Sequence, residues 1–64
     1  MFKQEIKEQV NKFNEYSEEG KMGVKIENGF ATLYINDKII TEDFDFTVLD
    51  RIKQINRERG FSYL

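Results

Sequence analysis

The stretch of sequence that determines the fold is VKIENGFATLYI, residues 24–35. Apolar and polar residues alternate on both sides of Asn28-Gly29, which is the pattern of two half-buried strands joined by a turn. Asn-Gly at such a point is typical of a two-residue type I′ turn, because both central residues of that turn need a positive φ. The turn would pair Glu27 with Phe30 and gather one apolar set on a single face of the hairpin. That set consists of Val24, Ile26, Ala31, Leu33 and Ile35.

A third strand is expected directly after this hairpin. The Asn-Asp pair at 36–37 tolerates left-handed backbone conformations and predicts a second tight turn. The chain would then return antiparallel, with Ile39 opposite Tyr34 and Ile40 opposite Leu33. In this register Ile40 joins the apolar face, whereas Ile39 lies on the other face of the sheet.

Residues 2–19 are predicted to form a helix before the hairpin. Their apolar residues recur every three or four positions, which places them on one stripe of a helix with 3.6 residues per turn. Gly20 follows, and we expect it to end the helix in the left-handed conformation that glycine adopts without strain. The predicted stripe consists of Phe2, Ile6, Val10, Phe13 and Tyr16.

A second helix is predicted after the third strand, whose end the pattern leaves open as far as Phe44. Two starts compete for this helix. Asp45 as N-cap would make a hydrophobic staple of Phe44 and Leu49, whereas Thr47 as N-cap would make a capping box with Asp50. Both starts give the same buried stripe, so the choice does not alter the predicted packing.

The second helix is expected to run through Arg59 and to end at a left-handed Gly60. Phe61 would then pack back on Ile55, and the apolar tail 61–64 is expected to dock on the core or on a partner. The buried stripe predicted for this helix consists of Val48, Leu49, Ile52 and Ile55.

These elements predict an α+β fold in the order α-β-β-β-α. A three-stranded antiparallel meander would carry both helices packed on one face, because both apolar stripes need the same apolar sheet face. No repeat, linker or low-complexity segment interrupts the sequence, so residues 1–64 are expected to form a single small globular domain.

The composition excludes most catalytic chemistry. The chain has no cysteine and no histidine, which rules out disulfides, zinc–thiolate sites and any Ser-His or Cys-His arrangement. Its four glycines are isolated, so no glycine-rich phosphate loop is present. The acidic residues at 43–45 lack the spacing of a calcium loop. We therefore expect no enzyme activity, no cofactor and no metal.

Cellular location is inferred from what the sequence lacks. No apolar run approaches the roughly 20 residues of a membrane span, and no signal-peptide core follows Met1. We expect a soluble, cytoplasmic protein without a membrane partner. The abundance of Lys, Glu, Asn and Ile, with no proline, is typical of a low-GC bacterium or its phage.

The main candidate site is the sheet face opposite the helices. Phe30, Thr32, Tyr34 and Ile39 should project from it, which is more apolar surface than a monomer normally exposes in one place. Aromatic residues frequently anchor protein–protein contacts, so this face is a candidate partner or homodimer surface. In the alternative interpretation these side chains only cover one another, or the tail folds over them.

A second candidate is the acidic stretch Glu42, Asp43, Asp45 and Asp50, followed by basic residues in the last helix. Acids at the start of a helix and bases at its end complement the helix dipole, which needs no partner. As a binding site, the acidic residues could mimic nucleic acid for a basic partner. The basic residues of the predicted helix are Arg51, Lys53, Arg57 and Arg59.

Direct nucleic-acid binding is disfavoured by charge. The net charge is −2 and the sequence pI is about 5.0, which opposes general phosphate binding. The α-β-β-β-α order is also the layout of double-stranded RNA-binding domains, which contact phosphates through a lysine-rich start of the second helix. Here the corresponding stretch is TEDFDF, residues 41–46, so the order carries no functional inference.

We therefore predict a small non-enzymatic module that binds another protein, acting as a phage or bacterial regulator or inhibitor. A homodimer is also expected, because dimerisation would add burial that so short a chain barely provides. The alternatives are a nucleic-acid-binding protein that uses the basic last helix together with Tyr34, and the acidic mimic.

Overall fold

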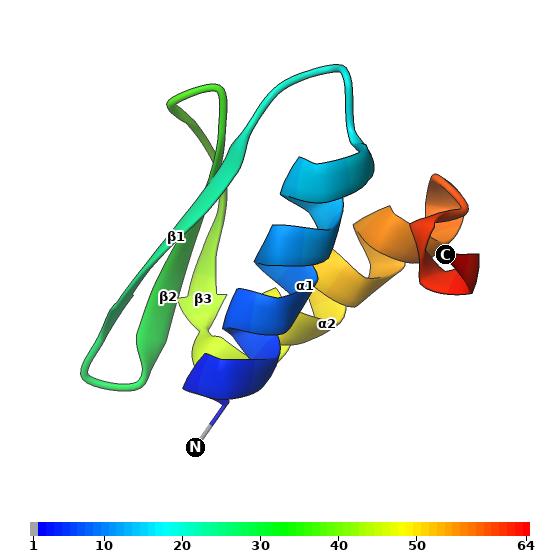
Figure 1. Cartoon of the computed structure of the whole chain (residues 1–64). Helices are drawn as coiled ribbons and strands as arrows, with labels where there is room; N and C mark the ends of the chain where they lie inside the picture. The colour runs from blue at the N-terminus through cyan, green and yellow to red at the C-terminus, as the bar shows by residue number, and fades with distance from the viewer. Residues whose placement is uncertain (1) are drawn as a thin grey trace.

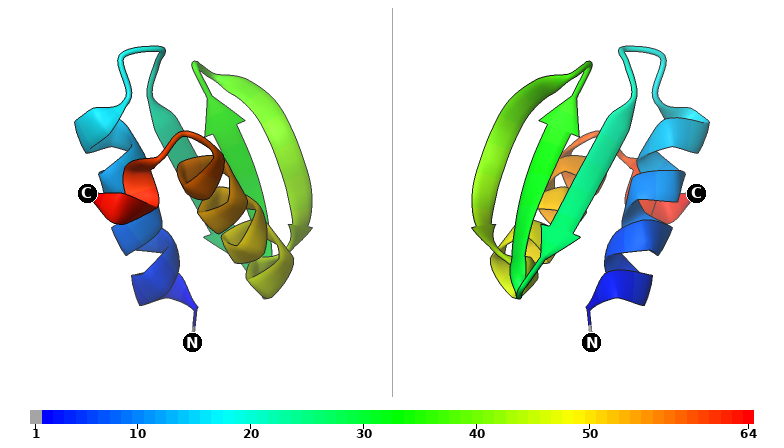
Figure 2. Two further views of the ribbon diagram at one scale, coloured as in Figure 1. Left: turned by 90° about the vertical axis from the view of Figure 1, so that its right-hand side faces the viewer. Right: turned by 90° about the vertical axis from the view of Figure 1, so that its left-hand side faces the viewer.

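A computed structural model describes residues 2–64 and confirms the α-β-β-β-α order. The three strands form one antiparallel sheet in the order β1-β2-β3. Both helices lie on the same side of this sheet, and the views from the two sides show that the described chain leaves the opposite sheet face uncovered (Figures 1 and 2). The elements are α1 (Lys3–Tyr16), β1 (Met22–Glu27), β2 (Phe30–Ile35), β3 (Lys38–Phe44), α2 (Asp45–Glu58) and the single 3₁₀ turn η1 (Phe61–Tyr63).

The β1–β2 hairpin has the predicted register. Glu27 pairs with Phe30, and the pairing continues without interruption to Met22 and Ile35. The turn residue Asn28 has a φ of 51° and Gly29 a φ of 81°, as a type I′ turn requires. The local Asn-Gly signal and the alternation of apolar residues therefore specify the same hairpin.

The β2–β3 pairing begins as predicted and then shifts by one residue. Residues 36–37 form the turn with positive φ values of 53° and 66°, and Ile39 pairs with Tyr34. The predicted pairing of Ile40 with Leu33 is wrong, because a β-bulge at this point makes Thr41 the partner of Leu33. Ile40 is the extra residue and remains exposed.

The bulge follows from the lengths of the two strands. Six residues of β2 are paired at both ends with seven residues of β3, since Ile35 pairs with Lys38 and Phe30 pairs with Phe44. One residue of β3 must therefore remain without its own partner. Beyond the bulge every side chain of β3 faces the sheet side opposite to the one that a regular ladder would give it.

Helix α1 ends earlier than predicted. Its last residue is Tyr16, and Ser17 already has an extended backbone with a φ of −80° and a ψ of 134°. The expected left-handed stop at Gly20 is wrong, because Gly20 is not among the residues with positive φ. Glycine at this position leaves room for a neighbour: a Cβ at position 20 would overlap the side-chain amide of Asn36, which would have to move.

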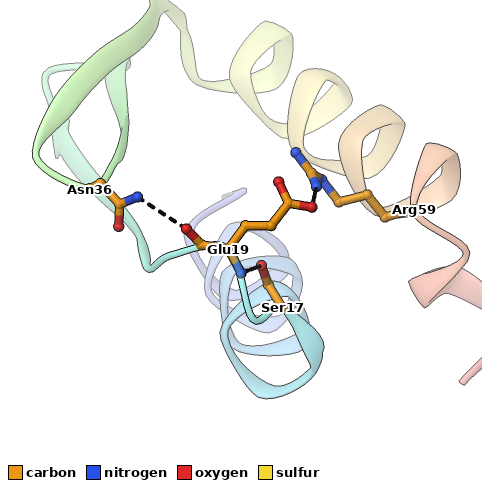
Figure 3. A network of polar contacts seen from close by, with 4 residues as sticks. All are labelled: Ser17, Glu19, Asn36 and Arg59. Atoms are coloured by element: carbon orange, nitrogen blue, oxygen red, sulfur yellow. Dashed lines mark hydrogen bonds and ion pairs between the residues drawn. The ribbon is translucent and has the colours of Figure 1, made fainter.

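The loop between α1 and β1 is held by the side chain of Asn36 from the β2–β3 turn (Figure 3). Asn36 Oδ1 accepts a hydrogen bond from the Lys21 backbone N–H at 3.1 Å, and its Nδ2 donates to the Glu19 carbonyl at 3.2 Å. The Glu19 backbone N–H in turn donates to Ser17 Oγ at 3.2 Å, and the Glu19 carboxylate binds Arg59 beyond the end of α2. This network joins three segments that are distant in sequence.

Gly20→Ala is expected to destabilise the fold by about 1–3 kcal/mol, because the new methyl group displaces the Asn36 side chain from its two hydrogen bonds. Urea unfolding followed by circular dichroism measures this loss. In an Asn36→Gly background, which keeps the left-handed turn without the obstructing side chain, the same substitution should cost much less. An equal cost in both backgrounds would show that the contact with Asn36 is not the cause.

Helix α2 begins at Asp45, and Phe44 occupies the N-cap position. Neither predicted cap forms within the described chain, because the N-cap residue makes no side-chain capping bond. The backbone instead fixes the start of the helix, since the Asp45 N–H donates to the Gly29 carbonyl at 2.9 Å. The helix ends at Glu58, one residue before the prediction, and Gly60 has the expected left-handed conformation with a φ of 79°.

The core lies between the sheet and the two helices and contains the predicted stripes. All four predicted residues of α2 are buried, whereas in α1 only Ile6 and Phe13 are fully so. Two buried residues lie outside the predicted sets, Met22 of β1 and the polar Asn56. Asn56 Nδ2 donates to the Gln9 carbonyl at 3.0 Å and to Gln9 Oε1 at 2.9 Å. The buried apolar residues are Ile6, Phe13, Met22, Ala31, Leu33, Val48, Leu49, Ile52 and Ile55.

The tail docks through one residue only. Phe61 packs against the core, with its ring centroid 6.0 Å from those of both Phe13 and Tyr16. Tyr63 and Leu64 are exposed. The tail lies beside α1 on the helical side of the molecule, so it does not cover the open sheet face (Figure 2).

Candidate protein-binding surface

The open face of the sheet, here called the outer face, is built by alternate residues of all three strands. The pairing places these residues in three rows that run across the sheet. The glycine row is Gly23–Tyr34–Ile39, the charged row is Lys25–Thr32–Glu42, and the aromatic row is Glu27–Phe30–Phe44.

Four of the sequence-predicted site residues lie together on this face. Phe30, Thr32 and Tyr34 project from the central strand, and Ile39 is paired with Tyr34 at one end. Ile39 is 62% exposed. A hollow of about 490 Å³ spreads over the outer face between the side chains of β1, β2 and β3. The strands therefore hold an open, shallow surface and not an enclosed cleft.

The charged row crosses the middle of the outer face with opposite charges at its two ends. Thr32 Oγ1 donates a hydrogen bond to Glu42 Oε2 at 3.1 Å, which orients the carboxylate over the sheet. On the other edge the Lys25 ammonium lies 3.8 Å from Glu27 Oε2, and both side chains are largely exposed. Such exposed pairs contribute little to folding, so both charges stay accessible to a partner.

The aromatic row continues into a series of stacked phenylalanines that the sequence analysis missed. The Phe30 and Phe44 ring centroids lie 4.8 Å apart, and Phe44 stacks on Phe46 at 5.7 Å with an interplanar angle of 3°. Phe2 continues the series at 6.4 Å from Phe46. Phe30, Phe44 and Phe46 are each about half exposed, at 50%, 50% and 51%.

The series escaped prediction because Phe44 reaches the outer face only through the bulge in β3. In the regular ladder expected from the sequence, Phe44 has no partner on the outer face, and its position favours one half of a hydrophobic staple with Leu49. The spacing of Phe44 and Phe46 signals only that two aromatic residues flank a helix start. Three stacked and half-exposed rings amount to an apolar patch larger than scattered surface residues produce.

The predicted acidic stretch is divided by the fold. Glu42 lies on the outer face opposite Thr32, whereas Asp43 pairs with the buried Ala31 and faces the helical side. Asp43 Oδ1 and Asp45 Oδ1 each accept a hydrogen bond from the next backbone N–H at 2.7 Å. The structure therefore brings Glu42 into the outer face and keeps Asp43 and Asp45 out of it.

The basic residues of α2, and Arg59 directly after its end, are separated from Tyr34, which lies on the opposite side of the sheet. Lys53 pairs with Glu5 of α1 at 3.7 Å, and Arg59 binds Glu19 while its guanidinium lies 5.6 Å from the centre of the Phe13 ring. Arg51 donates to Gln54 at 3.2 Å. No surface combines these cations with Tyr34, as a nucleic-acid site of the predicted composition would need.

Among residues 2–64 no three acidic side chains lie close enough together to hold a metal ion. None of the described helices is both long and apolar enough to cross a bilayer.

Comparison of the chain with models of known protein families finds no match, and comparisons with curated proteins and with solved structures find no significant match.

Proposed function

We propose that this protein is a non-enzymatic protein-binding module and that the outer face of its sheet is the binding surface. The observation that carries the proposal is the stacked and half-exposed pair Phe30–Phe44 on a face that no described segment covers, a stack that Phe46 continues at the start of α2. Aromatic residues at the centre of an interface supply large contact areas at little cost in side-chain entropy. As a regulator or inhibitor, the module would act by occupying a surface of its target.

The charged residues of the outer face also favour a protein as its partner. The outer face carries one cation, Lys25, and two anions, Glu27 and Glu42, together with its apolar residues. Protein–protein interfaces combine apolar contacts with charged groups of both signs, so this mixture is compatible with a protein partner. A nucleic-acid site would instead need an excess of positive charge, which the outer face lacks.

The proposal predicts that the outer face forms crosslinks to protein. Replacing Tyr34 with the photoreactive residue p-benzoylphenylalanine should yield a protein adduct on irradiation in extract of the source cell. The matched control carries the same residue at Tyr63, which is 85% exposed and belongs to η1, the segment beside α1 on the helical side of the molecule. Gel electrophoresis and mass spectrometry detect the adducts.

An adduct at position 34 that is absent from position 63 supports the proposal, whatever the mass of the attached protein. No protein adduct at position 34, or equal adducts at both positions, would overturn it. The adduct mass adds a second result, because a product of twice the chain mass identifies a second copy of this protein.

A further inference from the structure

We propose that the partner of the outer face is a second copy of this chain, packed face to face about a two-fold axis that runs along β2. The inference rests on the proposed function and names the partner at that same surface. Each of the three rows of the outer face has one feature that fits the same row of a second copy when this two-fold rotation is applied.

The geometry follows from the strand order β1-β2-β3. A two-fold axis parallel to the central strand and lying between two facing sheets puts β2 over its own copy and β1 over β3 of the other copy. Each row then meets the same row of the second copy in reverse order. The natural twist of the two sheets offsets their strands by about 30° from strict alignment, as in other aligned sheet packings.

The charged row selects this axis. Lys25 of each copy would face Glu42 of the other, which makes two symmetric pairs of opposite charge with Thr32 between them. A two-fold axis across the strands would instead place Lys25 over Lys25 and Glu42 over Glu42. Like charges facing one another oppose association, so of these two axes the one along β2 is electrostatically favourable.

The glycine row supplies a steric match. Gly23 lies inside β1, has no positive φ, and has no atom of the described chain within 4 Å of the place where a Cβ would lie. A glycine inside a strand often marks the close approach of another chain. Under the proposed axis Ile39, the most exposed large apolar side chain of the sheet, lies over Gly23 of the second copy.

The aromatic row places Phe30 against its own copy near the axis. Phe44, already stacked on Phe30 at 4.8 Å, then lies over the aliphatic part of Glu27 from the other copy. Phe30 and Phe44 of the two copies would form one continuous aromatic cluster across the interface. Burial of these half-exposed rings supplies the apolar contribution to association.

The expected affinity is moderate because the face is small. Three strands about 4.8 Å apart, with about 3.4 Å between successive residues, give a footprint at the lower end of specific interfaces. We therefore expect a dissociation constant in the micromolar range, which sedimentation equilibrium of the full chain measures directly.

Charge reversal provides the decisive experiment. Lys25→Glu and Glu42→Lys should each weaken dimerisation about tenfold or more, since each replaces two attractive contacts with two repulsive ones. The double variant Lys25→Glu/Glu42→Lys exchanges the charges and should recover most of the lost affinity, although not all of it, because the new carboxylate at position 25 lies beside Glu27. A mixture of the two single variants should form one-to-one heterodimers, which also shows that both are folded.

Matched controls separate the specific contacts from net charge. Lys7→Glu and Glu15→Lys on exposed positions of α1 change the net charge by the same amounts and should leave dimerisation unchanged within a factor of two. Gly23→Val should weaken the dimer because it fills the space for Ile39. It should not lower the stability of the monomer, since valine suits a strand better than glycine does.

The proposal is overturned if the wild-type chain stays monomeric at hundreds of micromolar, or if the single charge reversals have no effect. It is also overturned if the double variant fails to recover. A monomeric chain that still forms a foreign-protein adduct at position 34 would overturn the dimer and leave the protein-binding function standing. Absence of any adduct at that position would overturn the function itself.

Discussion

Phe13→Ala is expected to remove about 3–5 kcal/mol from the free energy of unfolding, because it deletes a large side chain from the centre of the core. Phe13 is 0% exposed and packs against Phe61, while the guanidinium of Arg59 lies over its ring. The side chain therefore joins α1 to the end of α2 and to the tail. At 0.05–0.15 kcal/mol per residue, a chain of 64 residues has a total stability of only about 3–10 kcal/mol.

This substitution should accordingly leave a large part of the protein unfolded at 25 °C. Urea titration by circular dichroism measures the loss, and the dispersion of amide proton resonances reports the folded population. Phe46→Ala is the matched control, since it removes the same atoms from a half-exposed position and should cost about 1 kcal/mol or less. Equal losses for the two variants would contradict the assignment of Phe13 to the centre of the core.

Asn56→Asp is expected to destabilise the protein by about 3–5 kcal/mol at pH 7, because it introduces an uncompensated charge at a fully buried position. Asn56 Nδ2 donates to the Gln9 carbonyl, and Asn56 Oδ1 is buried without a hydrogen-bond partner among the described residues. A carboxylate at this site has no N–H to donate, so an oxygen would lie against the Gln9 carbonyl where Asn56 now donates a hydrogen bond.

The pH dependence of this variant has a definite sign. Burial raises the pKa of the new carboxyl in the folded state above its unfolded value of about 3.9, because the low-dielectric core disfavours the charged form. The loss in free energy of unfolding relative to the wild-type protein should therefore be smallest at pH values below that unfolded pKa. It should grow as the pH rises and reach a plateau above the folded pKa.

Urea titrations of both proteins between pH 3 and pH 7 give this difference directly. Asn56→Leu, which has a similar size and carries no charge, is the control and should show a smaller loss that does not change with pH. A deficit for Asn56→Asp that stays constant over this range would argue against a charge buried at position 56.

The parts of the fold that could be predicted are those specified by short-range patterns. The type I′ turn at Asn28-Gly29 and the alternation on both sides of it define the β1–β2 register, and the structure has that register. The stripe of α2 and the left-handed Gly60 were also predictable, because helical periodicity and the stop at glycine depend on neighbouring residues alone.

The features that escaped prediction involve residues distant in sequence. Gly20 leaves room for the side chain of Asn36, sixteen residues later in the chain, and does not have a positive φ. Asn56 is buried because α2 packs on α1, where Gln9 accepts its hydrogen bonds. A polar side chain at that helical position gives no local sign that a partner lies across the interface.

The sequence alone therefore determined the order of elements, the first hairpin, the apolar stripes and the projection of Phe30 and Tyr34 from the outer face. Only the tertiary structure decided which of the alternating side chains of β3 point to that face. The turn at residues 36–37 fixes one end of the strand, and the bond from Asp45 to Gly29 fixes the start of α2 at the other. The seven residues of β3 must then pair with the six residues of β2, which forces a bulge into β3. The bulge turns the side chains of Glu42 and Phe44 toward the outer face, where they complete the candidate site.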